Sequence, residues 1–205
     1  INGAFYFRKS IKIVEGSMPA MHAYLDDFGK IIIWMNKNFY GGRSDYFSLV
    51  EGNSSQDLIV VNAEEHDTKM KYVLTCPADG TFGKDYKIRE SHGLMVPLQI
   101  RNIVSTDEFN RMFYYGGDDL GSIYHASHTD FALWAPTAVS VTLRIHKDKK
   151  VDSYPMKRSD HGVWRMRVEG DLSHALYCYF VERNGCVVRS LDPYALSSNG
   201  NGQYS

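Results

Sequence analysis

A period-two alternation of apolar and polar residues in the second half of the chain limits what this sequence can fold into. At residues 139–146 alternate apolar side chains face one way and polar ones the other, as in a β-strand with one buried face. The pair Asn184-Gly185 separates two further apolar runs, at 176–183 and 186–190, which is typical of a β-hairpin. Two more strand patterns lie at residues 131–135 and 164–168. This half therefore predicts a β-sandwich of the immunoglobulin type.

The first half of the chain shows similar but less regular patterns. Short apolar runs alternate with turns that carry Gly or Asn, as expected for a second sandwich. The runs that we interpret as strands lie at residues 30–36, 58–62, 70–75, 85–90 and 98–104. Between the halves, Ser105 with Glu108 three positions later forms a capping box, which predicts a helix of one or two turns through Met112.

These patterns predict an all-β fold of two immunoglobulin-like β-sandwich domains in tandem, over residues 1–108 and 109–205. A length of 205 residues is enough for two domains, and 43% hydrophobic against 23% charged residues excludes a disordered chain. The charges nearly cancel, because 23 Lys and Arg face 24 Asp and Glu. The chain therefore lacks the basic excess of a nucleic-acid-binding protein, and we expect no nucleic-acid partner.

Two features bear on where the protein works. No apolar run approaches the ~20 residues that span a bilayer, and the sequence shows no signal-peptide pattern, so we expect no membrane partner. The three cysteines, Cys76, Cys178 and Cys186, are odd in number and too few for a disulfide framework, which is typical of a reducing compartment. We therefore expect a cytoplasmic protein.

The sequence offers no recognisable catalytic pair. Hydrolysis of a glycosidic bond needs two carboxylates about 5–9.5 Å apart, facing each other across the sugar. The pairs Asp26-Asp27 and Asp118-Asp119 are adjacent, so their side chains diverge in an extended chain, and a role in turns is the better interpretation. We assign no catalytic role to the histidines either, because no acidic or nucleophilic partner lies near them in the chain.

Metal and cofactor sites are not predicted. The candidate ligands His125 and His128 lack a Cys or a third His at ligand spacing. No phosphate-binding loop, nucleophile elbow or dinucleotide fingerprint occurs in the sequence. We therefore expect neither a metal nor a cofactor.

Sugar binding is the chemistry that the composition favours. The chain has 14 Tyr, 10 Phe and 3 Trp, and aromatic rings stack on the apolar faces of sugar rings. Trp34 alternates with Ile33 and Met35 and lies near Tyr40 in the sequence, so Trp34 and Tyr40 are candidate glucan-binding residues. The alternative interpretation is that Trp34 packs under a loop.

Two motifs follow the predicted helix: residues 114–124 read YYGGDDLGSIY, and residues 131–138 read FALWAPTA. They resemble the start of the second N-terminal module of type I pullulanases, bacterial debranching enzymes of the α-amylase superfamily. Further similar motifs follow in order along the chain: Thr81-Phe82-Gly83-Lys84 and Pro97-Leu98-Gln99-Ile100 for the first module, then Gly162-Val163-Trp164, Gly170-Asp171-Leu172 and Leu191-Asp192-Pro193-Tyr194-Ala195 for a carbohydrate-binding module of family 48. The resemblance covers most of residues 70–205, and residues 1–69 more loosely.

The resemblance implies that the whole enzyme cleaves α-1,6 linkages in pullulan, starch or glycogen. The family's catalytic (β/α)₈ barrel needs about 250 residues and would begin after Tyr194-Ala195, where ten residues remain. None of the family's barrel motifs occurs here. Because the chain starts at Ile1 and not at Met, we expect it to be a non-catalytic piece of a longer polypeptide, with a downstream catalytic domain as its partner.

The resemblance also bears on sugar binding by the second module. Glycogen-binding members of family 48 use a Trp, a Lys and a second Trp, and Trp134 corresponds to the first of these. Cys178 stands where the Lys is expected, and Cys186 or Val187 where the second Trp is expected. Loss of a stacking ring and a cation should cost about 1–3 kcal/mol each. Docking on the barrel is thus the favoured role, and α-glucan binding through Trp34, Tyr40 or Trp134 stays open as the alternative.

Overall fold

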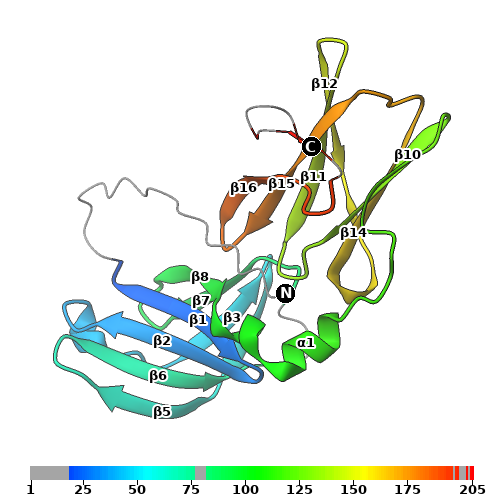
Figure 1. The fold of residues 1–205 in the computed structure, drawn as a ribbon. Coiled ribbons are helices and arrows are strands. Elements are labelled where there is room, and N and C mark those ends of the chain that lie inside the picture. Colours follow the sequence, from blue (N-terminus) through cyan, green and yellow to red (C-terminus); the bar gives the residue numbers. More distant parts are fainter. Residues whose placement is uncertain (1–18, 77–81, 196, 199–201, 203) are drawn as a thin grey trace.

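The computed structural model describes residues 19–76, 82–195, 197–198, 202 and 204–205 (Figure 1). Residues 1–18 of the expected first domain, and Thr81 of its Thr81-Phe82-Gly83-Lys84 motif, lie outside the described residues. Two bodies built from strands are joined by the short helix α1 (Asp107–Phe113). The prediction of an all-β chain with two sandwiches in tandem is confirmed, whereas the limits 1–108 and 109–205 stay a prediction.

The first domain is one continuous sheet of eight strands among the described residues, in the order β4-β3-β7-β8-β1-β2-β6-β5. Neighbouring strands are antiparallel except β1 and β8, which pair in parallel. The strands are β1 (Met21–Asp27), β2 (Lys30–Asn36), β3 (Phe47–Glu51), β4 (Ser54–Leu58), β5 (Val60–Glu65), β6 (Lys69–Thr75), β7 (Tyr86–Glu90) and β8 (Met95–Ile100).

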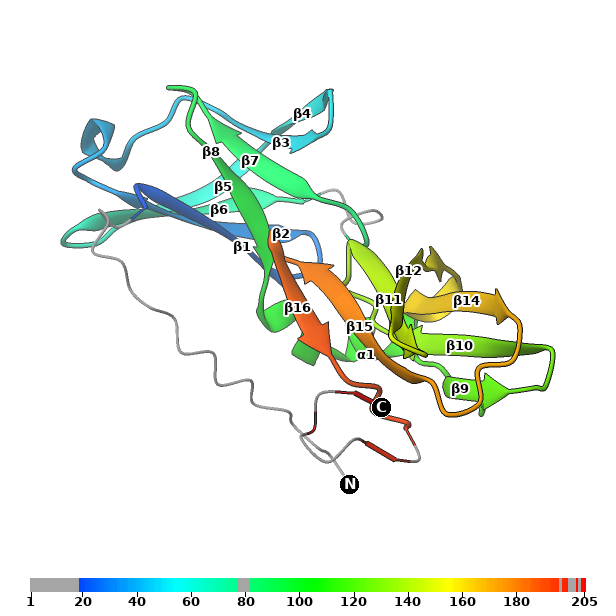
Figure 2. The same ribbon diagram turned by 90° about the horizontal axis from the view of Figure 1, so that it is seen from above.

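This sheet curls until its two edges meet. Edge strands β4 and β5 are separated by the single residue Ile59. The backbone N–H of Ile59 donates to Thr75 Oγ1 at 3.2 Å, and its carbonyl oxygen accepts from the N–H of Thr75 at 2.9 Å. Figure 2 shows the result, with β3, β4 and β7 forming a second layer apart from β2, β5 and β6. The curled sheet is therefore a sandwich.

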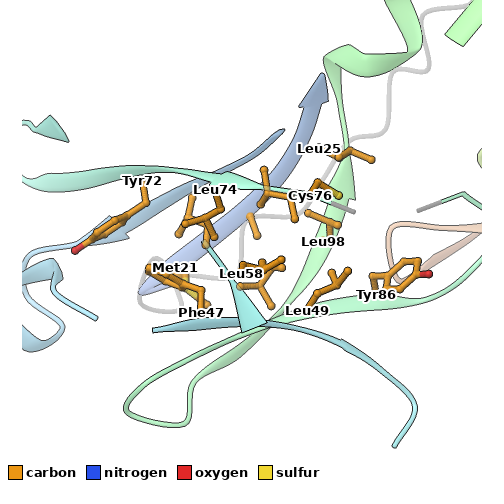
Figure 3. Packing of buried hydrophobic residues seen from close by; sticks show 14 of the residues in the cluster. Met21, Leu25, Phe47, Leu49, Leu58, Tyr72, Leu74, Cys76, Tyr86 and Leu98 are labelled. Carbon is orange, nitrogen blue, oxygen red and sulfur yellow. The ribbon is translucent and has the colours of Figure 1, made fainter. Parts of the chain in front are cut away.

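The core of the first domain lies between these layers. Strand β2 buries Ile31, Ile33 and Met35 completely, while the residues between them face outward, as the pleat of a strand requires. Figure 3 shows Met21 of β1 and Phe47 of β3 among the side chains that form this core. Burial of each such side chain stabilises the fold by about 1.5–3 kcal/mol.

The prediction of one strand over residues 58–62 is wrong. The chain instead leaves β4 at Leu58 and enters β5 at Val60, on the opposite edge of the sheet. Leu58 is buried, but Ile59 is 70% exposed and Val61 65% exposed. The apolar run is therefore a crossing between layers, and its composition alone cannot show that.

Two boundaries between the domains also differ from the prediction. The expected strand 98–104 ends at Ile100, and residues 102–105 form a 3₁₀ turn. The helix is capped by Thr106 and not by Ser105: Thr106 Oγ1 accepts from the N–H of Phe109 at 3.1 Å. Ser105 cannot cap the helix because it is the last residue of the 3₁₀ turn. Strands β1, β3 and β4 of the first domain were not predicted, and neither were three strands of the second domain, Gly121–Tyr124, Lys150–Pro155 and Lys157–Arg158.

The second domain is a sandwich of two four-stranded sheets, with the strand orders β13-β14-β10-β9 and β12-β11-β15-β16. The structure confirms the predicted strands at residues 131–135, 139–146, 164–168, 176–183 and 186–190. Their ends agree within one residue, except that the first of them begins three residues earlier, at His128. The strands are β9 (Gly121–Tyr124), β10 (His128–Trp134), β11 (Ser140–Lys147), β12 (Lys150–Pro155), β13 (Lys157–Arg158), β14 (Val163–Glu169), β15 (Leu176–Arg183) and β16 (Cys186–Ser190). Asn184 and Gly185 have φ values of 52° and 70°. A two-residue hairpin turn requires positive φ at both positions, so that the turn matches the right-handed twist of its strands.

Two features of the structure concern the environment of the protein. No helix among the described residues has the length and apolar character needed to cross a bilayer. Cys76 and Cys178 are buried, Cys186 is exposed, and none of the three forms a disulfide. Burial raises the pKa of the Cys76 thiol to about 11, so it is an inert core group. The cytoplasmic location stays a prediction.

Candidate functional site

Trp34 lies on the outer face of the first domain, as the alternation along β2 predicts. The strand register places it between His22 of β1 and Lys71 of β6. The ring of Trp34 lies 5.0 Å from the ring of His66, tilted by 51°. Trp34 is thus partly covered, and its ring neighbour is His66 and not Tyr40.

Tyr40 presents an open aromatic face. It begins the 3₁₀ turn η1 (Tyr40–Gly42) and is 63% exposed. Its ring stacks on the imidazole of His92 with centroids 3.7 Å apart and planes 15° apart, and Phe39 meets it edge-on at 4.9 Å. The backbone of Tyr40 has φ 44°, a left-handed conformation that costs a residue with a Cβ about 1–3 kcal/mol. The turn therefore holds this exposed ring in a backbone conformation that is uncommon for residues other than glycine.

A buried carboxylate holds this ring stack in place. Glu90 is completely buried, and its carboxylate accepts from the backbone N–H groups of His92 at 2.9 Å and Leu94 at 2.8 Å. The same carboxylate lies 2.8 Å from His92 Nδ1, so the expectation that no acidic partner lies near the histidines is wrong for His92. Contacts therefore run from Glu90 through His92 to Tyr40, and they hold the exposed ring of Tyr40 in one orientation.

Trp134, the third candidate platform, has a structural partner and an exposed face. Its Nε1–H donates to the carbonyl oxygen of Phe113 at 2.9 Å, which joins the end of β10 to the end of α1. The side chain nevertheless remains 41% exposed. The structure brings Trp134 together with neither Trp34 nor Tyr40, because the three residues lie on separate elements of the two domains.

The positions that the resemblance pairs with Trp134 do not resemble a sugar site. Cys178, in the place of the expected Lys, is 1% exposed inside β15. Cys186 and Val187, in the place of the second Trp, are exposed on the edge strand β16. Neither position supplies a cation or a second ring to Trp134.

The adjacent carboxylate pairs are engaged in structural contacts. Asp26 accepts two hydrogen bonds from the guanidinium of Arg101, and the pKa of this carboxyl is lowered mainly by those bonds. Asp119 accepts from Arg165 Nη1 at 2.6 Å and from the hydroxyl of Tyr115. The pKa of Asp119 is lowered for the same reason. Both carboxylates thus serve as ionised acceptors that join separate segments.

Sequence reasoning missed one group of side chains. At the tip of the β9–β10 hairpin, His125, His128 and Asp130 each place one possible metal-ligand atom within 4.8 Å of the others. The prediction of no metal site considered the two histidines without the carboxylate. The signal was present in the sequence, since residues 128 and 130 of a strand point to the same face.

The Leu191-Asp192-Pro193-Tyr194-Ala195 motif has a structural explanation. Asp192 is 5% exposed, and one carboxylate oxygen accepts from the hydroxyl of Tyr177 at 2.7 Å while the other accepts from the N–H of Tyr194 at 2.9 Å. Burial is the main cause of the raised pKa values of Tyr177 and of Tyr179, whose hydroxyl contacts the same carboxylate. The motif therefore fixes the chain after β16 onto the second domain.

The two domains contact each other through specific side chains. The ring of Phe82 in the first domain lies 5.1 Å from Phe113 of α1 and 5.4 Å from Phe109. Arg158 of the second domain packs on Gly83, where an added Cβ would lie 2.4 Å from Nη1. Figure 1 shows α1 beside the first domain, near the lower ends of β10 and β14. Arg158 thus packs directly on Gly83, and a Cβ at residue 83 would have to displace its guanidinium.

Comparison with known proteins agrees with this arrangement. Residues 21–105 match the family model of the pullulanase N1-terminal domain. Residues 119–195 match carbohydrate-binding module 48, also described as the isoamylase N-terminal domain. The two matches account for the two sandwiches in their order along the chain.

Individual relatives give the same result. The pullulanase of Bacillus subtilis strain 168 is 36% identical over 187 residues, which is 90% of this chain and 26% of that protein. A crystal structure of the Bacillus subtilis type I pullulanase, complexed with maltose, has a TM-score of 0.84 at 31% identity and covers 90% of this chain and 26% of its own.

The pullulanase of Anoxybacillus sp. LM18-11, complexed with maltotriose, also has a TM-score of 0.84, at 32% identity, with 90% of this chain and 27% of its own covered. This chain thus spans about a quarter of the length of the pullulanases it matches. It consists of a pullulanase N1-terminal domain followed by a family 48 carbohydrate-binding module, the N-terminal region of type I pullulanases.

Proposed function

We propose that the two domains are non-catalytic modules of an enzyme that hydrolyses α-1,6-glucosidic linkages in pullulan, starch or glycogen, and that they dock on and support a catalytic domain of the same polypeptide. The observation that carries the proposal is the pair of family matches, in pullulanase order, on a chain about a quarter as long as its relatives. The specific contacts at the junction support it further, because they hold the two domains in one arrangement, on which a third domain can pack.

One edge of the second domain suits such docking. Strand β16 ends its sheet, and its Val187 and Val188 are 61% and 41% exposed. Apolar residues on an open edge strand are typical of an interaction surface, because an unprotected edge of this kind otherwise invites aggregation. The opposite edge strand of the same sheet, β12, carries Val151, which is 53% exposed.

These two edges provide a matched test in the full-length enzyme. We expect Val187→Lys to lower the thermal midpoint and the rate of pullulan hydrolysis, because a charge would be placed against the catalytic domain. Val151→Lys, a similar change on the opposite edge, should alter neither. Equal behaviour of the two variants would contradict docking through β16, and unchanged melting after removal of residues 1–190 would contradict the support role.

The isolated chain should release no reducing sugar from pullulan, because one carboxylate of each adjacent pair, Asp26 and Asp119, is hydrogen-bonded to an arginine and the sequence offers no recognisable catalytic pair. Turnover by the purified 205-residue chain would contradict the non-catalytic assignment.

Glucan capture is the second candidate function, and the stack of Tyr40 on His92 favours it. The open face of Tyr40 is oriented and strained as described above, and it suits the apolar face of a glucose ring. In affinity electrophoresis through gels that contain pullulan or glycogen, we expect Tyr40→Ala to remove most of any retardation. Tyr124→Ala, at a tyrosine that is 51% exposed in the second domain, is the control. Equal mobility of the unmodified chain with and without glucan would exclude this function.

A further inference from the structure

The β9–β10 hairpin brings three ligand-type side chains to one face. His125 and His128 are paired across the turn, where the N–H of each donates to the carbonyl oxygen of the other at 2.9 and 3.3 Å. Two residues paired in this way in an antiparallel ladder point their side chains to the same face. Asp130 follows His128 by two positions in β10 and therefore lies on that face as well. The hairpin geometry, and not chance contact, makes the three side chains neighbours.

Their distances suit a common ligand. The two imidazole rings have centroids 4.5 Å apart, and His128 Nε2 lies 3.5 Å from Asp130 Oδ2. One donor atom from each of the three residues lies within 4.8 Å of the others. Ligand atoms around a tetrahedral ion bound at 2.0–2.2 Å are separated by about 3.3–3.6 Å, so small rotamer changes suffice to close the site.

Neighbouring groups orient the ligands. Ser127 Oγ lies 3.0 Å from His128 Nδ1, which leaves Nε2 available toward Asp130. Arg167 of β14 donates from Nε to Asp130 Oδ1 at 2.7 Å and from Nη2 to Oδ2 at 3.0 Å, and so holds the carboxylate in place. Glu169 stands opposite His128 in the register. Outer contacts of this kind commonly fix metal-binding side chains.

We propose that His125, His128 and Asp130 form a binding site for a divalent first-row transition metal of the Zn²⁺ type, which fastens the hairpin tip to strand β10. Two imidazoles and one carboxylate suit Zn²⁺, whereas Mg²⁺ and Ca²⁺ prefer oxygen ligands alone. His125 is exposed, so an ion can enter directly from solvent. The charge of Arg167 opposes the ion, so the site binds more weakly than a closed structural zinc centre. This site is independent of the proposed pullulanase function.

The test uses the full 205-residue chain with Cys186→Ser, which removes the exposed thiol as a competing zinc ligand. After chelator treatment, Zn²⁺ is titrated by calorimetry and the thermal midpoint is measured with and without it. We expect one Zn²⁺ per chain, a higher midpoint with Zn²⁺, and no response to Mg²⁺. His128→Ala and Asp130→Asn should each weaken binding at least about tenfold, the scale on which metal sites respond to a lost contact.

The control is His174→Asn, which removes an exposed histidine elsewhere in the second domain. Asn suits this position because residue 174 has φ 59°, a conformation that Asn tolerates. This variant should bind Zn²⁺ as the parent does. The proposal fails if the parent binds no Zn²⁺, or if His128→Ala or Asp130→Asn binds it as tightly as His174→Asn does. The midpoint of each variant without metal shows that it is folded.

Discussion

The side chain of Asn184 forms two hydrogen bonds with the backbone of Ile100, across the junction between the two domains. Its Oδ1 accepts from the N–H of Ile100 at 2.9 Å, and its Nδ2 donates to the carbonyl oxygen of Ile100 at 3.2 Å. Asn184 is also the first residue of the β15–β16 turn, where it has φ 52°. One residue therefore shapes a hairpin and joins that hairpin to the end of β8.

Replacement of Asn184 by Gly separates these two roles. Glycine accepts the left-handed turn conformation but removes both hydrogen bonds to Ile100. We expect the free energy of unfolding to fall by about 1–3 kcal/mol, the net value of two such bonds, when measured by urea denaturation. Asn110→Ala, at an exposed position of α1, should change it by less than about 0.5 kcal/mol. A loss no larger than that of the control would show that the two bonds do not join the domains.

The aromatic cluster at the junction predicts a larger effect. Phe113 is 6% exposed and packs against Phe82 and Phe109. We expect Phe113→Ala to lower the free energy of unfolding by about 3–5 kcal/mol, as is usual for a buried phenylalanine. Met112, the preceding residue of the same helix, is 42% exposed, and Met112→Ala should cost far less. If both variants unfold at the same urea concentration, the cluster does not stabilise the junction.

Gly162 illustrates a close approach of two backbone segments. It has φ 73°, and a Cβ there would lie 2.4 Å from Cα of Pro136. Gly170 has φ 97°, but a Cβ added to it would meet no atom within 4 Å. Gly170→Ala therefore carries only the cost of a left-handed backbone, about 1–2 kcal/mol, whereas Gly162→Ala adds a collision. Calorimetry should show a clearly lower thermal midpoint for Gly162→Ala, and equal midpoints would mean that residues 136 and 162 move apart readily.

Asp171 predicts a pH dependence of stability. Its pKa is lowered to about 2, first by the backbone N–H of Ser173 and then by the hydroxyls of Ser173 and Tyr124. Because the pKa is lower in the folded than in the unfolded state, its stabilisation is complete above about pH 4 and is lost as the pH falls toward about 2. Asp171→Asn should flatten that part of the curve of thermal midpoint against pH. Identical curves for the parent and for Asp171→Asn would contradict the prediction.

The local features of the fold were predictable and the pairings between distant segments were not. The alternation over residues 139–146 and the turn Asn184-Gly185 identified β11, β15 and β16, because a buried face and a two-residue turn both leave marks in adjacent residues. The run at residues 58–62 misled the prediction, since Ile59 crosses between the two layers of the first domain. Where the curled sheet closes on itself, the apolar residues Ile59 and Val61 are exposed, so apolar composition alone does not predict which residues are buried.

The candidate sites show the same division. Residue types and their order determined that the chain consists of two sheet domains and that the modules resemble those of type I pullulanases. Only the tertiary structure decided that His92 and Glu90 support Tyr40, that Asp130 joins the two histidines, and that Asn184 binds Ile100. The physical reason is that alternation and turns depend on neighbouring residues, whereas a ring stack, a ligand set or a domain contact depends on the strand pairing that brings remote residues together.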